Sequence, residues 1–289
     1  MLVASDLSEA SEGALRAGAR VATALGAPLV VVHGVRAQPL GFLRPEVREA
    51  PPGEPMVRAR EALARQVGQT LGPEARPELH IAVGAPAEIV AGLATSLAAE
   101  VVVLGPHRPR GPLDGLLGAT ADRIVRVARR PCLLVNAPLV APLRAVLVPT
   151  DLSPVAREAL TLAARWLVRS RGSDPAEPLR LRLLHVGDAS SSASARAAAR
   201  RLLDEEVARA RRLLGEAQCL VEGLTSMQHV PAQAILSAAD AMPADLVVLG
   251  TRGSSGVTRL LLGSVAGAVM RTLRRPLVIV PPGASGPAS

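Results

Sequence analysis

Short apolar runs alternate with longer amphipathic segments along this chain, and the alternation is clearest in its second half. Apolar runs rich in Val, Leu and Ile are typical of strands that a parallel sheet buries on both faces. The segments between them carry apolar residues at helical spacing. The pattern predicts strands at 145–148, 179–186, 219–224, 246–249 and 277–280, and helices at 154–168, 193–214, 231–241 and 264–273.

The first half of the chain repeats the landmarks of the second half at a constant distance. Asp6 corresponds to Asp151 (151 − 6 = 145), and Gly105 corresponds to Gly250 (250 − 105 = 145). The same distance joins three further pairs, namely Gly118 and Gly263, Pro86 and Pro231, and Pro131 and Pro276. A period of this length fits a globular domain and is too long for a solenoid unit, so the sequence predicts two copies of one domain.

The order of elements predicts the fold class. Alternating strands and helices indicate an α/β protein, here two tandem open parallel five-stranded sheets with helices on both faces. We expect one domain over residues 1–137 and the other over residues 143–282. Ligands of such sheets bind at the carboxyl ends of the strands, beside the first strand of the domain.

A glycine-rich loop follows the fourth predicted strand of the second copy. Gly250-Thr251-Arg252-Gly253 comes directly after the apolar run, and Gly263-Ser264 opens the next predicted helix. Glycine lets a phosphate approach the backbone, and the start of a helix offers unpaired N–H groups to an anion. The loop therefore predicts a phosphate site in the second domain.

Composition narrows the classes of partner. The net charge is +8 and every basic residue is arginine, but acidic residues intervene between the arginines and the chain has one Trp, one Phe and no Tyr for base stacking. We therefore expect no nucleic-acid partner. The absence of lysine excludes a P-loop lysine and a Schiff base. Cys132 and Cys219 lack metal-ligand spacing and are expected to be free thiols, with Cys132 in the core.

Segment lengths bear on location. No uninterrupted apolar run approaches the length of a membrane span, and the first residues lack the basic-then-apolar order of a secretory signal. We expect a cytoplasmic protein without a membrane partner.

These motifs together resemble those of the universal stress protein family, and the resemblance covers both halves of the chain. The ATP-binding members carry G-x2-G-x9-G-[S/T], which is matched here by Gly250, Gly253, Gly263 and Ser264. The strand end Val148-Pro149-Thr150-Asp151 and the closing Arg-Pro-aliphatic strand fit the same family. The resemblance implies a Rossmann-like fold of the adenine nucleotide alpha hydrolase type.

The resemblance also implies a ligand, which is ATP, AMP or ADP, with Mg²⁺ bound through the phosphates. No carboxylate cluster marks a dedicated metal site. By similarity, the adenine and ribose would contact Pro149, Thr150, Asp151 and the backbone of Val186. The ribose and phosphates would contact the loop and the helix start, namely Gly250, Thr251, Arg252, Gly253, Gly263, Ser264 and Val265.

The first domain departs from this motif. Arg108 stands in place of the second glycine and Ala119 in place of the serine, although Thr120 follows. Either Arg108 reaches a phosphate directly, or it fills an empty site, and we favour lost or weakened binding. The weaker candidates there are Asp6, Gly105, Arg108, Gly118 and Thr120. In the second domain His229 occupies the place of Gly84, so a side chain is expected to crowd the mouth of the pocket.

Several of these residues have a structural interpretation as well. Asp6 and Asp151 are also suited to stabilise the helix starts that follow them. His33 and His185 end predicted strands, and we expect both to be packed and hydrogen-bonded in the core. Trp166 lies at core spacing on a predicted helix and requires no ligand.

The sequence contains no recognisable catalytic constellation. We therefore expect a stress-response sensor or regulatory binding protein rather than an enzyme, with at most slow and incidental ATP hydrolysis. The alternative is a scaffold of the same fold that binds no nucleotide and contacts only other proteins. The two domains should pair as an intramolecular pseudo-dimer through residues 133–135 and 278–280, which covers two exposed sheet edges. This pairing leaves room for a further homodimer and for protein partners that the sequence does not identify.

Overall fold

Strands and helices alternate through both halves of the computed structural model, which describes residues 1–35, 53–106, 119–171, 178–188, 190–215, 219–251 and 262–284. The elements of the first half are β1 (Leu2–Ala4), α1 (Glu9–Ala24), β2 (Val30–Val35), α2 (Glu54–Leu71), β3 (Glu78–Val83), α3 (Pro86–Ser96), β4 (Val102–Leu104), α4 (Ala119–Val127) and β5 (Cys132–Leu134). Those of the second half are β6 (Ala145–Thr150), α5 (Pro154–Ser170), β7 (Leu179–Val186), α6 (Ala193–Leu214), β8 (Cys219–Ser226), α7 (Pro231–Ala241), β9 (Leu246–Gly250), α8 (Ser264–Thr272) and β10 (Leu277–Val280).

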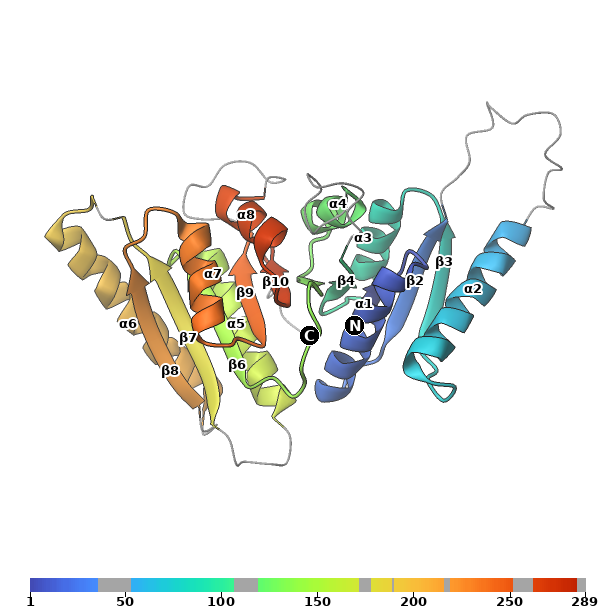
Figure 1. Ribbon diagram of the computed structural model, residues 1–289, viewed down its shortest axis with the longest axis horizontal. Coiled ribbons are helices and arrows are strands. Elements are labelled where there is room, and N and C mark those ends of the chain that lie inside the picture. Colours follow the sequence, from blue (N-terminus) through green and yellow to red (C-terminus); the bar gives the residue numbers. More distant parts are fainter. Residues whose placement is uncertain are drawn as a thin grey trace, which may run out of the picture.

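The strands of both halves form one ten-stranded sheet in the order β3-β2-β1-β4-β5-β10-β9-β6-β7-β8. Pairing is parallel within each half and antiparallel only where β5 meets β10, at the middle of the molecule (Figure 1). The predicted α/β class is confirmed, and each predicted five-stranded sheet is one half of the continuous sheet.

β5 pairs with β10 and joins the domains as predicted, but over residues 132–134 and 277–279, one position earlier in each strand. Leu133 pairs with Val278, and its neighbours Leu134 and Cys132 pair with Leu277 and Ile279. All of these side chains are buried, so two strand edges that each half would leave open are covered.

Helices cover both faces of the sheet. One hydrophobic core contains buried residues of α1, α2, α5 and α6, and the other contains buried residues of α3, α4, α7 and α8. Each core includes strand residues of both domains, so the apolar layers continue across the junction. Trp166 is 1% exposed, as its helical spacing predicts, and Cys132 is buried in β5.

The helix starts differ between the two copies. The Ser153 Oγ accepts a hydrogen bond of 3.3 Å from the Ala156 N–H, which caps α5, and Pro154 stands at the first helical position. In the first copy the Ser8 hydroxyl instead donates to Asp6 Oδ1 over 2.5 Å and makes no cap on α1. The first copy therefore uses its serine and aspartate to close the turn rather than to cap the helix.

Candidate functional site

Three strand ends define the edge of the sheet where the predicted site residues meet. β6 pairs with β7 on one side and with β9 on the other, all in parallel. Their last residues, Thr150, Val186 and Gly250, therefore lie along the same edge. β6 and β9 extend further than predicted, so Pro149, Thr150 and Gly250 belong to strands rather than to loops.

The turn from β6 to α5 is held by its own polar side chains. The Thr150 Oγ1 accepts a hydrogen bond from the Leu152 N–H over 3.0 Å, and the Asp151 Oδ1 accepts one from the Ser153 N–H over 3.1 Å. Leu152 takes a left-handed backbone conformation with φ of 65°. The carboxylate thus stabilises the turn, and because the Asp151 side chain is exposed, it is also accessible at the carboxyl ends of the strands.

The first copy contains the same turn. Ser5 Oγ accepts from the Leu7 N–H over 3.0 Å, Asp6 Oδ1 accepts from the Ser8 N–H over 3.0 Å, and Leu7 has a φ of 64°. A left-handed leucine in both copies is unusual, because a side chain makes this conformation costly. Asp6 and Asp151 thus each close the turn before a helix, whereas the side-chain cap of α5 comes from Ser153 and α1 has no such cap.

The two strand-end histidines reinforce these turns. His185 Nδ1 lies 3.1 Å from the Thr150 carbonyl oxygen, and His33 Nδ1 lies 2.8 Å from the Ser5 carbonyl oxygen. Both rings are hydrogen-bonded as expected, but both are half-buried, and the expectation of core burial is therefore wrong. Both histidines are partly exposed because they lie near the carboxyl ends of β2 and β7, where the strands leave the core.

The strand end at β9 and the start of α8 lie next to each other. The Gly263 N–H donates to the Thr251 carbonyl oxygen over 2.8 Å, and the Thr251 N–H donates to the Val280 carbonyl oxygen over 2.9 Å. No side chain caps α8 among the residues described, and Ser264 at its first position is exposed. Val265 is half-buried and packs on the core below. The first N–H groups of α8 thus face the edge without a side-chain acceptor.

Thr251 carries the most unusual group of this edge. The residue is 6% exposed, and no atom of the described residues hydrogen-bonds to its Oγ1. A buried hydroxyl without a partner costs free energy and calls for an explanation.

Gly250 has a structural reason to be glycine. A Cβ at this position would lie 3.0 Å from Val155 Cγ1, and a Cβ at Gly105 would lie 3.0 Å from the Ala10 carbonyl oxygen. These glycines let α5 and α1 pack closely against the strand ends. This packing explains the first glycine of the motif in both copies without any phosphate.

Four of the predicted site residues lie outside the described residues. Arg252 and Gly253 belong to this group in the second domain, and Arg108 and Gly118 belong to it in the first. The predictions for these residues stay predictions.

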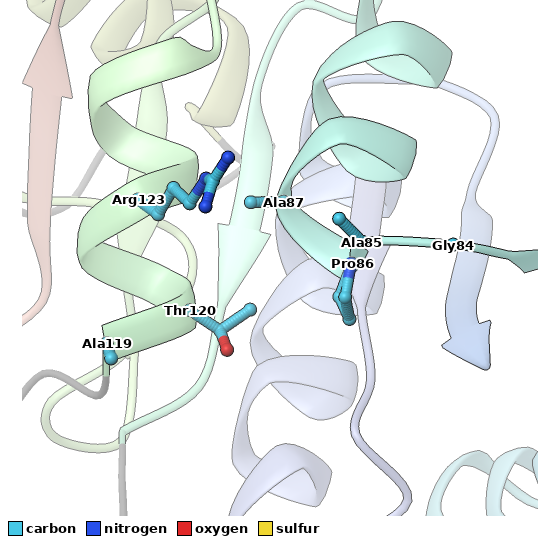
Figure 2. A pocket seen from close by; sticks show the side chains of 7 residues that line it. All are labelled: Gly84, Ala85, Pro86, Ala87, Ala119, Thr120 and Arg123. Atoms are coloured by element: carbon cyan, nitrogen blue, oxygen red, sulfur yellow. The ribbon is translucent and has the colours of Figure 1, made fainter. Parts of the chain in front are cut away.

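A pocket of about 450 Å³ lies in the first domain between α3 and α4. Figure 2 shows Thr120 and Arg123 of α4 on one side of this pocket and Pro86 and Ala87 of α3 on the other. Gly84, Ala85 and Ala119 complete the described lining. Among the described candidates of the first domain, Thr120 contacts this pocket.

Arg123 is a pocket residue that the motif did not reveal. It follows Thr120 by three positions on one helix, and this spacing is the signal that could have identified it. Its Nη2 lies 2.7 Å from Glu88 Oε1, so its charge is partly engaged.

The second domain differs at the positions that correspond to this lining. At the repeat distance of 145, His229 corresponds to Gly84, Val265 to Thr120 and Ala268 to Arg123. Gly84 has a φ of 147°, a conformation that residues with a side chain rarely adopt. The two domains therefore offer chemically different surfaces at equivalent places.

His229 is exposed at the end of β8 and lies close enough to Asp188 to affect it electrostatically. The Ser190 N–H, 2.8 Å from Asp188 Oδ1, lowers the pKa of the Asp188 carboxyl, and His229 acts in the same direction. The expectation that His229 crowds the mouth of a nucleotide pocket stays a prediction.

Within the described ranges, no group of three or more His, Cys, Asp or Glu side chains is placed to hold a metal ion. Across the described helices, none has the length and apolarity needed to cross a bilayer.

The repeat, the sheet order and the turn motif define a tandem α/β protein with two similar halves. The sequence profile of the Universal stress protein family matches residues 1–136 and again residues 142–281. The chain belongs to the universal stress protein family and contains two tandem copies of its domain.

Individual relatives are similar to parts of the chain. A universal stress protein of Methanocaldococcus jannaschii is 43% identical over 54 residues, which are 19% of this chain and 32% of that protein. A universal stress protein of Thermus aquaticus is 38% identical over 82 residues, which are 27% of this chain and 60% of that protein. The matched segments thus span less than two thirds of the length of either relative.

Solved structures are similar over nearly the whole chain. A universal stress protein of Archaeoglobus fulgidus has a TM-score of 0.68 at 20% identity and covers 98% of both chains. A putative universal stress protein of Pseudomonas aeruginosa has a TM-score of 0.65 at 15% identity, over 97% of this chain and 91% of that one. These likenesses concern the fold.

Proposed function

We propose that this chain binds an adenine nucleotide, as ATP, ADP or AMP, at the strand-end edge of its second domain. The observation that carries the proposal is the buried Thr251 hydroxyl, whose Oγ1 has no hydrogen-bond partner in the described residues. It lies beside the start of α8, where N–H groups lack a side-chain acceptor. An anionic ligand at this place would satisfy both kinds of donor.

Each neighbouring element supplies a group suited to one part of the ligand. The helix start and the Ser264 hydroxyl suit the phosphates, because both present donors to an anion. The exposed Asp151 carboxylate suits the ribose hydroxyls, and the strand end at Val186 offers backbone groups to the adenine edge. Mg²⁺ would be held mainly by the phosphates, since the described residues contain no ligand cluster of their own.

The proposed role is that of a cytoplasmic sensor or regulatory binding protein of a stress response, whose contacts with partner proteins depend on the bound nucleotide. Any hydrolysis of ATP is proposed to be slow and incidental, because the groups named here bind and orient but do not form an acid–base pair. Binding in the first domain is proposed to be weaker, since Ala119 replaces the serine at the start of α4.

Titration calorimetry with ATP and Mg²⁺ tests the proposal on the full chain. We expect one site per chain, and we expect the double variant Gly253→Ala with Ser264→Ala to lose it. Thr272→Ala is the matched control, because Thr272 lies at the far end of the same helix and its hydroxyl donates to the Ala268 carbonyl oxygen over 2.8 Å. A wild-type Kd weaker than about 1 mM, which corresponds to about 4 kcal/mol of binding free energy, would contradict nucleotide binding.

One observation favours the alternative of a protein-contact scaffold. Leu220 and Leu224 of the outer strand β8 are 51% and 41% exposed, and Val230 just beyond it is 46% exposed. Exposed apolar side chains along an open strand suit a protein partner. Under this alternative the double variant would leave every property of the chain unchanged, including its affinity for a partner.

A further inference from the structure

Three side chains of the second domain converge on one carboxylate of the first. Glu100 lies in the turn before β4. Its Oε1 accepts a hydrogen bond from Trp166 Nε1 over 2.9 Å and forms an ion pair with Arg165 Nη2 at 3.1 Å. Its Oε2 accepts a hydrogen bond from Arg169 Nη1 over 3.0 Å. We call these four residues the Glu100 cluster.

The centre of the cluster is shielded from water and its arginines lie at the surface. The Glu100 side chain is 22% exposed and Trp166 is 1% exposed, whereas Arg165 and Arg169 are 46% and 37% exposed. Arg169 also donates to the Leu25 carbonyl oxygen, so it contacts the first domain at two places. Charged hydrogen bonds at partly buried sites are stronger than exposed ion pairs, and breaking one side leaves a charge without its partner.

The cluster is matched only in part on the other side of the junction, where Arg20 corresponds to Arg165 (165 − 20 = 145). At the repeat distance, Asp245 corresponds to Glu100 (245 − 100 = 145), and Val21 corresponds to Trp166 (166 − 21 = 145). Asp245 accepts hydrogen bonds from the N–H groups of Arg144 and Ala145, both over 2.8 Å, within its own domain. Two nearly equivalent domains are therefore joined by a strongly asymmetric polar contact.

This asymmetry affects which domain pairs with β5 and which pairs with β10. β5 and β10 are equivalent apolar strands, so their backbone pairing alone would also allow two first domains, or two second domains, of separate chains to join. A pair of first domains would keep Arg20, the counterpart of Arg165, near Glu100, but it would put Val21 and Ala24 in the places of Trp166 and Arg169. A pair of second domains would place Trp166 opposite the shorter and already engaged Asp245.

We infer that the Glu100 cluster is the specificity element of the junction: it favours pairing of the first domain with a second domain over pairing between like domains. Specificity of this kind comes from groups that are satisfied in one pairing and unsatisfied in the others. The inference is independent of nucleotide binding.

Reversing the charge of Glu100, alone and together with its two arginine partners, tests the cluster on the full chain. Trp166 is the sole tryptophan and the chain has no tyrosine, so its fluorescence reports on the cluster directly. We expect Glu100→Arg to shift the emission to longer wavelength and to increase quenching by acrylamide, because like charges then face each other. The triple variant Glu100→Arg, Arg165→Glu, Arg169→Glu should restore most of the wild-type emission.

Glu88→Arg is the matched control, because it also turns a carboxylate into a cation opposite an arginine, in an exposed pair away from the junction. It should leave the emission unchanged. Wild-type emission and quenching in Glu100→Arg, or a triple variant that remains as perturbed as the single one, would overturn the inference.

Partner choice is measured by refolding an equimolar mixture of Glu100→Arg and Arg165→Glu/Arg169→Glu chains. Each chain alone has like charges at its junction, whereas exchange between the two chains satisfies both junctions. We expect a one-to-one complex of twice the chain mass of 29.8 kDa by light scattering, with tryptophan emission restored. A mixture that shows only the properties of its two components would also overturn the inference.

Discussion

The Ser5 hydroxyl donates a hydrogen bond of 2.6 Å to Gln66 Oε1, which ties the end of β1 to α2. Gln66 Nε2 in turn donates to the Ser8 carbonyl oxygen over 2.9 Å and to Ser11 Oγ over 3.1 Å. The side chain is 8% exposed and all of its polar atoms have partners. This buried amide therefore fixes the turn that carries Asp6.

The second domain replaces this amide by a carboxylate. Glu206 follows the buried Leu203 by three positions, as Gln66 follows Leu63, and it is 6% exposed. Its Oε1 lies 2.6 Å from Arg157 Nε, but its Oε2 has no hydrogen-bond partner among the described residues. The β6–α5 turn thus lacks the complete polar network of its counterpart.

We predict that Gln66→Glu destabilises the protein by about 2 kcal/mol or more, because it removes the donor to the Ser8 carbonyl oxygen and buries a charge beside it. Urea denaturation followed by circular dichroism measures the change. Gln69→Glu is the control, since Gln69 is exposed on the same helix and the substitution should change the unfolding free energy by less than about 0.5 kcal/mol. Equal effects of the two substitutions would contradict the role given to Gln66.

Thr251→Val is predicted to separate folding from binding. Valine keeps the shape of the buried side chain and removes an unpartnered hydroxyl, so thermal stability should be unchanged or higher. If the hydroxyl contacts the nucleotide, the Kd for ATP should rise about tenfold, which corresponds to about 1.4 kcal/mol. Calorimetry and thermal denaturation of the same sample give both quantities, and a loss of stability with unchanged affinity would refute the assignment.

Gly105→Ala is predicted to cost more stability than Gly250→Ala. The new Cβ would meet the backbone oxygen of Ala10 in the first case and the movable Val155 side chain in the second. We expect a loss of about 1–3 kcal/mol for Gly105→Ala, which is typical of overpacking.

Gly13→Ala is the control for this comparison, because no atom of its surroundings lies within 4 Å of the added Cβ on α1. It should raise stability by about 0.5–1 kcal/mol through the better helix propensity of alanine. Chemical denaturation gives all three values. If Gly105→Ala is as harmless as Gly13→Ala, the close approach of α1 is not what requires glycine.

The two thiols make stability sensitive to alkaline pH. Burial raises the pKa of Cys132 to about 12 and that of Cys219 to about 11, from an ordinary value of 9.0. Above pH 9 the unfolded thiols ionise while the folded ones stay neutral. Stability is therefore full below pH 9 and falls as the pH rises toward 11 and 12.

The chain is well suited to detect this effect, because without lysine and tyrosine few other groups titrate in this range. We predict that unfolding free energy falls by at most about 1.4 kcal/mol per pH unit for each thiol above pH 9. The double variant Cys132→Ala/Cys219→Ala should lose this slope in urea denaturation at pH 8 to 11. A variant whose stability declines as steeply as that of the wild type would contradict the assignment to the thiols.

The sequence predicts the regular elements of this protein well, because local patterns determine them. The bounds of β7, α6, α7 and β10 agree with the prediction to the residue, and the pairing of β5 with β10 follows from the repeat and from two apolar edges. Strand ends were predicted less well, since Pro149 and Thr150 extend β6 through tertiary pairing with β7.

The polar contacts of the interior could not be predicted from local pattern. Glu100 and Trp166 are 66 positions apart, and Gln66 reaches Ser5 over 61 positions, so only the folded chain reveals these partners. The histidines at the strand ends are another example. Their hydrogen bonds follow from the turn geometry, whereas their partial exposure depends on how far each strand extends at the rim.

The union of β5 with β10 also determines where the assembly can grow. Because β5 and β10 pair with each other, the outermost strands of the described sheet are β3 and β8. These two strands differ in length and in side-chain character. Like-to-like contact at either end would stop at two copies, whereas joining one end to the opposite end would leave a fresh strand exposed after each addition and extend into a filament. A single fused chain has thus exchanged the two-fold-related ends of a symmetric pair for two distinguishable ones, and its higher-order state depends on which of them attracts a neighbour.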